Sequence, residues 1–299
     1  MKKKDLLIVV RGGGDIATGT IYTLWKSGFR VLVLEMEYPS AIRRQVAVCE
    51  AVYHGEALVE DLRVVRIPVP LPKPMSKIEE NTGVTLGKDS TLSREWLLQE
   101  IDACYEKGVV PLMIDPEGES ISILKPQVVV DAILAKKNLG TKKTMATMTI
   151  ALGPGFEAGV DVDYVIETMR GHNLGRVMEK GFALPNTGVP GVIAGYDKER
   201  VIHSPAKGRM QLVHQIGDFV NQGEVIARVE QENGEQVPIY ASITGLIRGL
   251  ITENYPVTEG LKIADIDPRK QEYDNCFTIS DKARCIAGSV LGLVCRLVE

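Results

Sequence analysis

The stretch that decides the fold reads LLIVVRGGGDIATG at residues 6–19, and VLVLE follows at residues 31–35. Both segments contain runs of β-branched and leucine side chains, which are typical of buried parallel strands. Three glycines end the first run, and the residues between the two runs suit a helix. The sequence therefore predicts a strand, a glycine-rich turn, a helix and a second strand.

The glycine-rich turn matches the Ala-ended form of the dinucleotide fingerprint, Gly12-x-Gly14-x-x-Ala17. Gly12 permits a tight turn, Gly14 lets the backbone approach a pyrophosphate, and Ala17 lets helix and strand pack closely. Glu35 ends the second strand, near the place where an acid binds a ribose hydroxyl. A purely structural turn is the alternative. The predicted cofactor-binding residues of this unit are Gly12, Gly13, Gly14, Asp15, Ile16, Ala17 and Glu35.

Composition and charge exclude several classes of protein. A formal net charge of −4 argues against a general nucleic-acid binder, which normally carries a basic excess. No apolar run of this chain approaches the ~20 residues of a membrane span. The five cysteines are scattered and form no C-x-x-C pair, which suits a reducing cytoplasm and gives no zinc signature. We therefore expect a cytoplasmic protein with no nucleic-acid, membrane or metal site.

Further apolar runs predict further strands along the first two thirds of the chain. They occupy residues 109–114, 128–131, 148–152 and 162–167. A helix is expected at residues 93–107, where apolar side chains share one face and Gly108 follows as a stop. This alternation favours a Rossmann-like, doubly wound parallel sheet within residues 1–199.

An internal repeat marks a second architecture after residue 200. Residues 204–230 align without a gap with residues 241–267; Gly208 corresponds to Gly245 and Val220 to Val257, an offset of 37 residues. Each copy is too short to bury its own apolar face, so the two copies must share a core. The repeat resembles the biotinyl/lipoyl-type barrel-sandwich fold. Its hairpin at residues 231–236 contains no lysine, so we expect no covalent cofactor arm.

The C-terminal segment predicts an amphipathic helix that begins near Ser280 or Asp281. Such a helix needs a sheet to cover, and the simplest arrangement returns it to the first domain. The predicted fold class is thus α/β, with an all-β barrel-sandwich domain (residues 200–267) inserted into a Rossmann-like domain (residues 1–199, completed by 268–299).

A charged loop follows the last predicted strand. It reads ETMRGHNLGR at residues 167–176, and active sites of open α/β sheets lie beyond the carboxyl ends of strands. Arg170 could recognise an anion, and His172 could act as donor, base or ligand. The predicted catalytic residues are His172, Arg170 and Glu167. The alternative, in which Glu167 pairs with an arginine and His172 caps a helix, stays open.

A lysine-rich loop follows another strand end, at residues 136–143. Lys137 and Thr141 could hold a phosphate there, and a solvated loop is the alternative. Together with the glycine turn, these loops predict one crevice at the carboxyl edge of the sheet.

Taken together, the motifs resemble the selenium-dependent molybdenum hydroxylase accessory family of the YqeB type. The resemblance rests on VRGGGDIATG (10–19), AIRR (41–44), AVYHG (51–55), IALGPGF (150–156), ETMRGHNLGR (167–176) and NTGVPG (186–191). The loop at 167–176 is also similar to xanthine dehydrogenase accessory proteins. The resemblance implies a maturation factor that pairs a Rossmann domain with handling of the molybdenum cofactor.

Three functions are therefore expected, in this order. The first is a maturation factor that binds a phosphate-bearing cofactor, of molybdopterin or nucleotide type, and assists its sulfur or selenium modification. The second is an NAD(P)-dependent oxidoreductase, and the third is a non-catalytic docking scaffold. The expected partners are a molybdenum hydroxylase and the phosphate-bearing cofactor, and a homodimer is one expected assembly. The candidate cofactors are the molybdenum cofactor and NAD(P).

Overall fold

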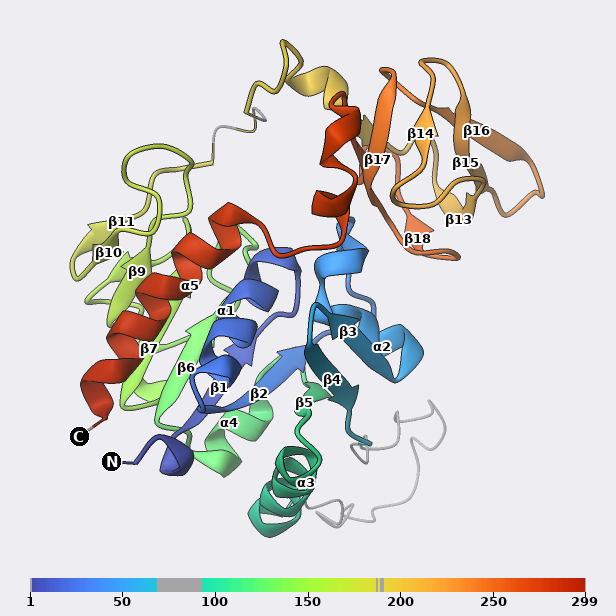
Figure 1. Ribbon diagram of the computed structural model, residues 1–299. Helices are drawn as coiled ribbons and strands as arrows, with labels where there is room; N and C mark the ends of the chain where they lie inside the picture. The colour runs from blue at the N-terminus through green and yellow to red at the C-terminus, as the bar shows by residue number, and fades with distance from the viewer. Residues whose placement is uncertain (1, 69–92, 187, 189–190, 299) are drawn as a thin grey trace, which may run out of the picture.

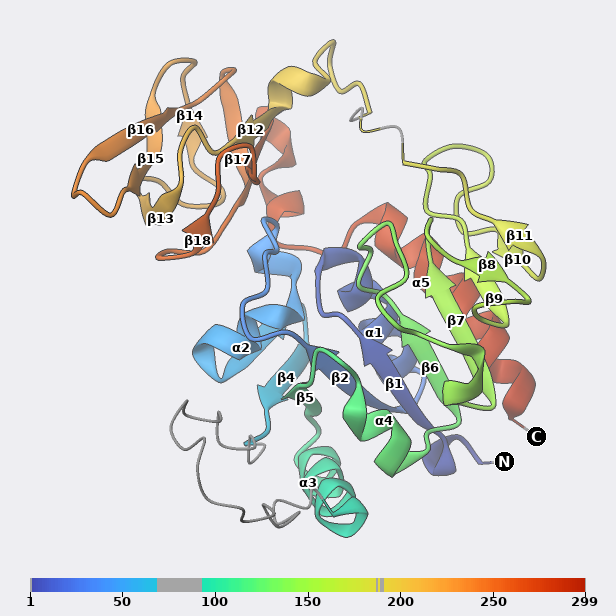
Figure 2. The same cartoon turned by 180° about the vertical axis from the view of Figure 1, so that it is seen from behind.

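The computed structural model describes residues 2–68, 93–186, 188 and 191–298. Its largest element is a nine-stranded sheet with the order β10-β9-β7-β6-β1-β2-β5-β4-β3 (Figures 1 and 2). The strands, in chain order, are β1 (Leu7–Arg11), β2 (Arg30–Glu35), β3 (Glu56–Val59), β4 (Leu62–Arg66), β5 (Val110–Ile114), β6 (Val128–Asp131), β7 (Met148–Leu152), β9 (Tyr164–Ile166) and β10 (Val177–Met178). The glycine turn follows β1, near the middle of this sheet.

The sheet is mixed, so the predicted doubly wound parallel sheet is wrong. The strands from β9 to β4 run parallel, but β3 pairs antiparallel with β4, and β10 pairs antiparallel with β9. Helices also fail to alternate with strands beyond β6. The connections β6–β7 and β7–β9 contain only a 3₁₀ turn (Lys143–Met145) and the short strand β8 (Glu157–Ala158), which pairs with β11 (Gly181–Phe182).

Helices cover both faces of the sheet. Helix α1 (Asp15–Lys26) and the C-terminal helix α5 (Asp281–Val294) lie side by side on one face, over the core made by alternate residues of the strands. Helices α3 (Arg94–Glu106) and α4 (Glu119–Leu124) cover the other face, and the short α2 (Ala51–His54) lies near the β3 edge (Figures 1 and 2). Helix α5 thus takes the place that a crossover helix after β6 or β7 would fill.

Two four-stranded antiparallel sheets form the part between residues 201 and 267. Their orders are β12-β19-β17-β14 and β16-β15-β13-β18. The strands are β12 (Val201–His203), β13 (Gly208–Leu212), β14 (Phe219–Val220), β15 (Val225–Glu230), β16 (Gln236–Tyr240), β17 (Gly245–Leu250), β18 (Pro256–Val257) and β19 (Lys262–Asp267). The two copies of the repeat exchange strands, because β14 pairs with β17 and β18 pairs with β13. They share one apolar core. We call this part the β domain.

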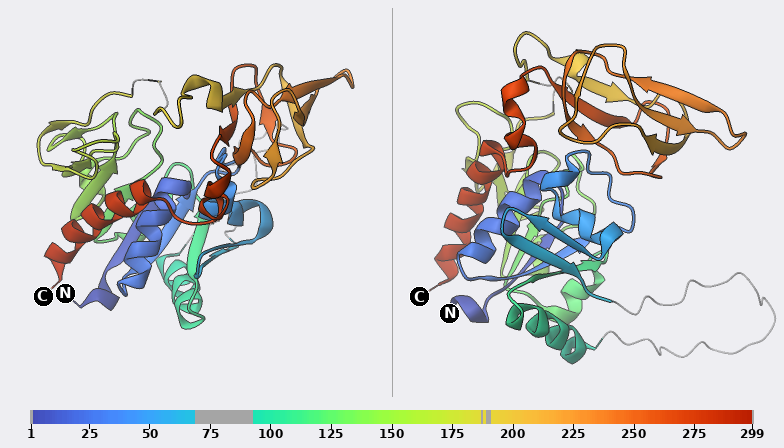
Figure 3. Two further views of the ribbon diagram at one scale, coloured as in Figure 1. Left: turned by 45° about the horizontal axis from the view of Figure 1, so that its top comes forward. Right: turned by 45° about the vertical axis from the view of Figure 1, so that its right-hand side comes forward.

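The β domain packs on the loop that follows β2, at the carboxyl edge of the large sheet (Figure 3). Ile42 of that loop packs against the core of the β domain, and its carbonyl accepts a hydrogen bond from the Leu250 amide at 2.7 Å. The Arg44 Nε donates to the Leu250 carbonyl, also at 2.7 Å. The loops after β1 and β9 approach the same region. No helix in the described ranges is long and apolar enough to cross a membrane.

Candidate functional site: an arginine-rich cavity beside the glycine turn

The glycine turn is packed closely on one side and open on the other. Gly12 has a φ of +97°, and a Cβ there would lie 2.9 Å from the Ala132 carbonyl oxygen, so only glycine fits. Gly14 has no heavy atom within 4 Å of the position that its Cβ would take. Asp15 begins α1, and an anion can approach the first amides of that helix from the open side.

Glu35 holds the glycine turn through its carboxylate. Its Oε2 accepts a hydrogen bond from the Gly13 amide at 2.7 Å, and its Oε1 accepts one from the Met36 amide at 2.8 Å. Burial raises the pKa of Glu35, and these two bonds lower it in part. The Cys49 amide covers Gly13 by donating to the Gly13 carbonyl at 2.9 Å. In this arrangement Glu35 positions the turn itself, where we expected it to meet a ribose. Ile16 and Ala17 of the same fingerprint are buried in the core under α1.

The three predicted catalytic residues separate in the structure. The Glu167 side chain is buried and accepts hydrogen bonds from the amides of Met169 at 2.6 Å and Leu184 at 2.8 Å, so it fixes the loop. His172 is exposed and does not line the cavity described below. Arg170 does line it and forms a bidentate pair with Asp281, at 3.1 and 3.2 Å.

The two residues of the lysine-rich loop also differ in role. Thr141 is fully buried; its hydroxyl accepts a hydrogen bond from Arg11 Nη1 and donates to Asp131 Oδ2, both at 2.6 Å. Burial raises the pKa of Asp131, and the bond from Thr141 opposes that rise. Thr141 is therefore committed to a buried network at the ends of β1 and β6. Lys137 is exposed on the same loop.

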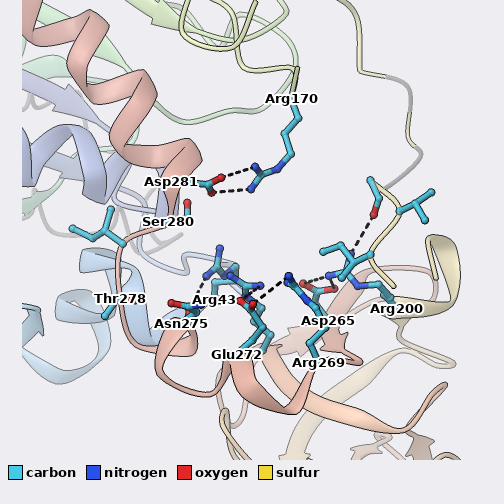
Figure 4. A pocket seen from close by; sticks show the side chains of 15 residues that line it. Arg43, Arg170, Arg200, Asp265, Arg269, Glu272, Asn275, Thr278, Ser280 and Asp281 are labelled. Carbon is cyan, nitrogen blue, oxygen red and sulfur yellow. Dashed lines mark hydrogen bonds and ion pairs between the residues drawn. The ribbon is translucent and has the colours of Figure 1, made fainter. Parts of the chain in front are cut away.

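A cavity of about 590 Å³ lies between the sheet edge and the β domain. Five arginines line it, together with three acids and the residues that precede α5. Figure 4 shows Arg170 pointing toward Asp281 on one side and Arg43 beside Asn275 on the other. The lining residues are Arg43, Arg170, Gly191, Val192, Ile193, Arg200, Arg248, Asp265, Arg269, Glu272, Asn275, Thr278, Ile279, Ser280 and Asp281.

On the side of the β domain, carboxylates already engage the arginines. Arg200 Nη2 donates to Asp265 Oδ1 at 3.1 Å. Asp267, which is fully buried, accepts from Arg248 at 2.7 Å and from Arg269 at 2.8 and 2.9 Å. Burial raises the pKa of Asp267, but the Arg269 and Arg248 hydrogen bonds outweigh it and bring the pKa down to about 2. These three arginines mainly stabilise the wall of the cavity.

On the side of the large sheet, the cations are less well paired. The guanidinium of Arg43 makes two long contacts, both at 3.4 Å, to Asp15 Oδ2 and to the Asn275 carbonyl. Its Nε is buried and has no partner within the described chain. Burial lowers the pKa of Arg43, since desolvation disfavours its charge. Arg170 and its partner Asp281 are largely exposed, so that pair is weak.

The sequence pointed to only part of this cavity. Arg170 was a predicted site residue, and Asp15, which pairs with Arg43, connects the cavity to the glycine turn. Arg200, Arg248 and Arg269 were missed. They come from separate strands and turns of the β domain, so no local spacing marks them. The described residues contain no group of three or more His, Cys, Asp or Glu side chains that could hold a metal ion.

In sequence, the chain is similar to a curated bacterial protein. The chain is 44% identical over 294 residues to "Uncharacterized protein YqeB" of Escherichia coli (strain K12); the match covers 98% of this chain and 48% of that protein. The chain therefore spans about half the length of the curated relative. No protein-family model matches it.

The similar solved structures are distant. An aspartoacylase family protein from Mesorhizobium loti has a TM-score of 0.26 and 12% identity, over 88% of this chain and 86% of that one. The apo ectoine utilization protein EutE (DoeB) from Ruegeria pomeroyi has a TM-score of 0.24 and 11% identity, over 87% of this chain and 85% of that one. TM-scores this low carry no argument for an activity.

These structures differ in kind from the expected relatives. One of the two structures is an aspartoacylase family protein and the other is an ectoine utilization protein. Neither is a molybdenum-enzyme accessory protein or an oxidoreductase. The predicted maturation function and its oxidoreductase alternative therefore find no support among these structures and are not carried further. The scaffold alternative is not tested by them. The predicted Rossmann-like and barrel-sandwich class also finds no support; the structure has a mixed sheet and two antiparallel sheets. The expected partners and the homodimer stay predictions.

Proposed function

We propose that the protein binds a small molecule with at least two anionic groups, phosphate or carboxylate, in the cavity beside the glycine turn. Arg43 carries the proposal, because its half-buried guanidinium has only two 3.4 Å contacts and its buried Nε has no partner among the described residues. A partly desolvated charge that lacks good hydrogen bonds costs free energy, because the polar contacts do not replace its lost hydration. An anionic ligand removes that cost, and each charge-assisted hydrogen bond contributes about 1.5–3 kcal/mol.

The ligand needs two anionic groups because the cavity offers two separate cationic positions, Arg43 and Arg170. Arg43 lies on one side of the cavity, next to Asp15 and the start of α1, and Arg170 lies on the other side at the start of α5. The amino ends of both helices are directed to this region, and their dipoles favour negative charge. A single small anion would engage one of the two arginines; a molecule with two anionic groups engages both.

Two parallel calorimetric titrations test the proposal, one with inorganic pyrophosphate as the phosphate probe and one with citrate as the carboxylate probe. We expect wild-type protein to bind one of the two, and Arg43→Gln to weaken binding at least ~10-fold, which corresponds to about 1.4 kcal/mol. Arg170→Gln should weaken it in the same direction. Arg63→Gln is the matched control, because Arg63 pairs with Glu56 on the exposed surface of β3 and β4, away from the cavity.

The comparison between the pyrophosphate and citrate titrations identifies the chemistry of the ligand. Binding of pyrophosphate alone indicates a phosphate ligand, and binding of citrate alone indicates a carboxylate ligand. No heat with either probe would overturn the proposal. Equal affinities in the Arg43 and Arg63 variants would overturn it as well, because binding would then lie outside the cavity.

We also propose that this chain and the Escherichia coli protein belong to one family, supported by 44% identity over nearly all of this chain. That protein is uncharacterized, so the relationship supplies no activity. If the proposal holds, the arginine that aligns with Arg43 in the relative should be needed for the same anion. A cytoplasmic location is proposed on the five free cysteines.

A further inference from the structure

Both arginines of the proposed anion site are paired with an aspartate of the same chain. Arg170 donates from Nη1 to Asp281 Oδ2 at 3.1 Å and from Nη2 to Asp281 Oδ1 at 3.2 Å (Figure 4). Arg43 donates from Nη1 to Asp15 Oδ2 at 3.4 Å. Asp281 and Asp15 are the first residues of α5 and α1. The pair of Arg170 is bidentate, whereas that of Arg43 uses a single nitrogen.

The pair between Arg170 and Asp281 occupies the end of the guanidinium that an anionic ligand would bind. A planar guanidinium holds carboxylate and phosphate groups through its two terminal nitrogens. Both terminal nitrogens of Arg170 donate to Asp281, so a ligand group that uses the same end must displace the carboxylate. The hydrogen bonds from Arg170 also lower the pKa of Asp281, which keeps the carboxylate charged at neutral pH.

Asp281 can leave this contact without loss of its helix. Its side chain is 78% exposed and that of Arg170 is 58% exposed, so both can exchange the contact for water. Ser280 caps α5, because its hydroxyl accepts a hydrogen bond from the Ala283 amide at 3.2 Å. Asp15 is less free: its side chain is 32% exposed, and Gly14 before it offers α1 no side-chain cap.

We propose that Asp281 is an internal occupant of the anion site. Its carboxylate holds Arg170 in the free protein, and the second anionic group of the ligand takes its place. The inference rests on the proposed anion site and adds a regulating contact to it. Binding breaks the pair, and the displaced carboxylate then repels the incoming anion, so Asp281 weakens binding. The opposite role, in which Asp281 orients Arg170 toward the ligand, requires that Asp281 strengthen binding.

Calorimetric titration of Asp281→Asn with inorganic pyrophosphate and with citrate tests the inference, since asparagine keeps the shape of the side chain and removes its charge. We expect the variant to bind whichever probe the wild type binds at least ~3-fold more tightly, at about 20 mM salt. An exposed ion pair accounts for up to about 5-fold, and loss of the repulsion adds to it. The gain should shrink at about 0.5 M salt, where exposed charges are screened.

Three variants serve as controls. Asp281→Glu keeps the charge and should bind the probe as the wild type does. Asp61→Asn changes the net charge equally, but Asp61 pairs with Lys26, the last residue of α1, away from the cavity, so the affinity should not change. In an Arg170→Gln background, Asp281→Asn should tighten binding less than ~2-fold, because the pair to be displaced is gone.

The outcomes identify which proposal has failed. If the wild type binds a probe but Asp281→Asn binds it equally or more weakly, the internal occupant is wrong and the anion site stands. Equal tightening in Asp61→Asn would overturn the inference as well, because net charge would then explain the gain. If neither the wild type nor Asp281→Asn binds pyrophosphate or citrate, the anion site itself is wrong, and the inference fails with it.

Discussion

Glu50 shows how burial sets the chemistry of a single residue. Its Oε2 lies 3.8 Å from Arg44 Nη1 and 3.6 Å from His54 Nε2. Burial raises its pKa from 4.5 to about 7, and Arg44 opposes that rise only in part. Because the pKa is higher in the folded state, the folded state is favoured by protonation. The stabilisation that protonated Glu50 contributes to the folded state is therefore fully present below pH 4.5. It is lost as the pH rises through about 7.

Replacing Glu50 with glutamine should remove this pH dependence. We expect the free energy of unfolding of the wild type to fall between pH 5 and pH 8 by up to about 3 kcal/mol on account of Glu50. Urea denaturation at several pH values measures the difference between wild type and Glu50→Gln. Glu56→Gln is the control, because Glu56 is exposed beside Arg63. Parallel pH curves for wild type and Glu50→Gln would show that Glu50 stays ionised in the folded protein.

At the scale of elements, the contact between α1 and α5 fixes the edge on which the site forms. Both helices begin at the cavity and run side by side across the same face of the sheet (Figure 1). A Cβ added to Gly19 would lie 2.7 Å from the Ala283 Cβ and 2.9 Å from the Ala283 carbonyl carbon. The small residue lets the two backbones approach each other closely.

Gly19→Ala should destabilise the protein although alanine is the better helix former. Propensity favours the change by up to about 1 kcal/mol, while overpacking costs typically about 1–3 kcal/mol. We expect a net loss of about 1 kcal/mol in the free energy of unfolding, measured by chemical denaturation. Gly288→Ala is the matched control in α5, where the added Cβ meets no atom within 4 Å, so that variant should gain stability. A gain in both variants would mean that the helices separate without cost.

At the scale of the whole molecule, Ile42 attaches the β domain to the sheet edge. Its side chain reaches Gly249, where an added Cβ would lie 3.2 Å from the Ile42 Cδ1. The backbone bond between Ile42 and Leu250, together with Arg44, completes the attachment. The cavity exists only while this attachment holds, because one wall belongs to each part.

Ile42→Ala should loosen the attachment without unfolding either part. We expect a local loss of about 2 kcal/mol, so that hydrogen exchange of the Leu250 amide becomes roughly 30-fold faster. The Val9 amide, in the middle of the large sheet, should keep its rate. Val213→Ala, at an exposed position of the β domain, is the control. Unchanged exchange at Leu250 would show that the hydrogen bonds alone hold the two parts together.

Most individual elements could be predicted from local pattern. The apolar runs give β1, β2, β5, β6 and β7 close to their observed bounds, and the expected helix at 93–107 is α3. The antiparallel pairs at both edges were missed, since β3, β4 and β10 are short and lack a strong period. The site was predicted only in part: Arg170 lines the cavity, whereas Glu167 and Thr141 turned out to hold loops through buried hydrogen bonds.

The sequence by itself determined the features that depend on neighbouring residues: the glycine turn, the buried strands and the two related copies in the β domain. Backbone sterics and side-chain periodicity act over a few residues, so they can be read along the chain. Only the tertiary structure decided the mixed sheet and the cavity. Arg43, Arg170 and Arg248 are far apart in sequence, and what each does depends on burial and on charges from other elements. Burial and long-range Coulomb interactions exist only once the chain has folded.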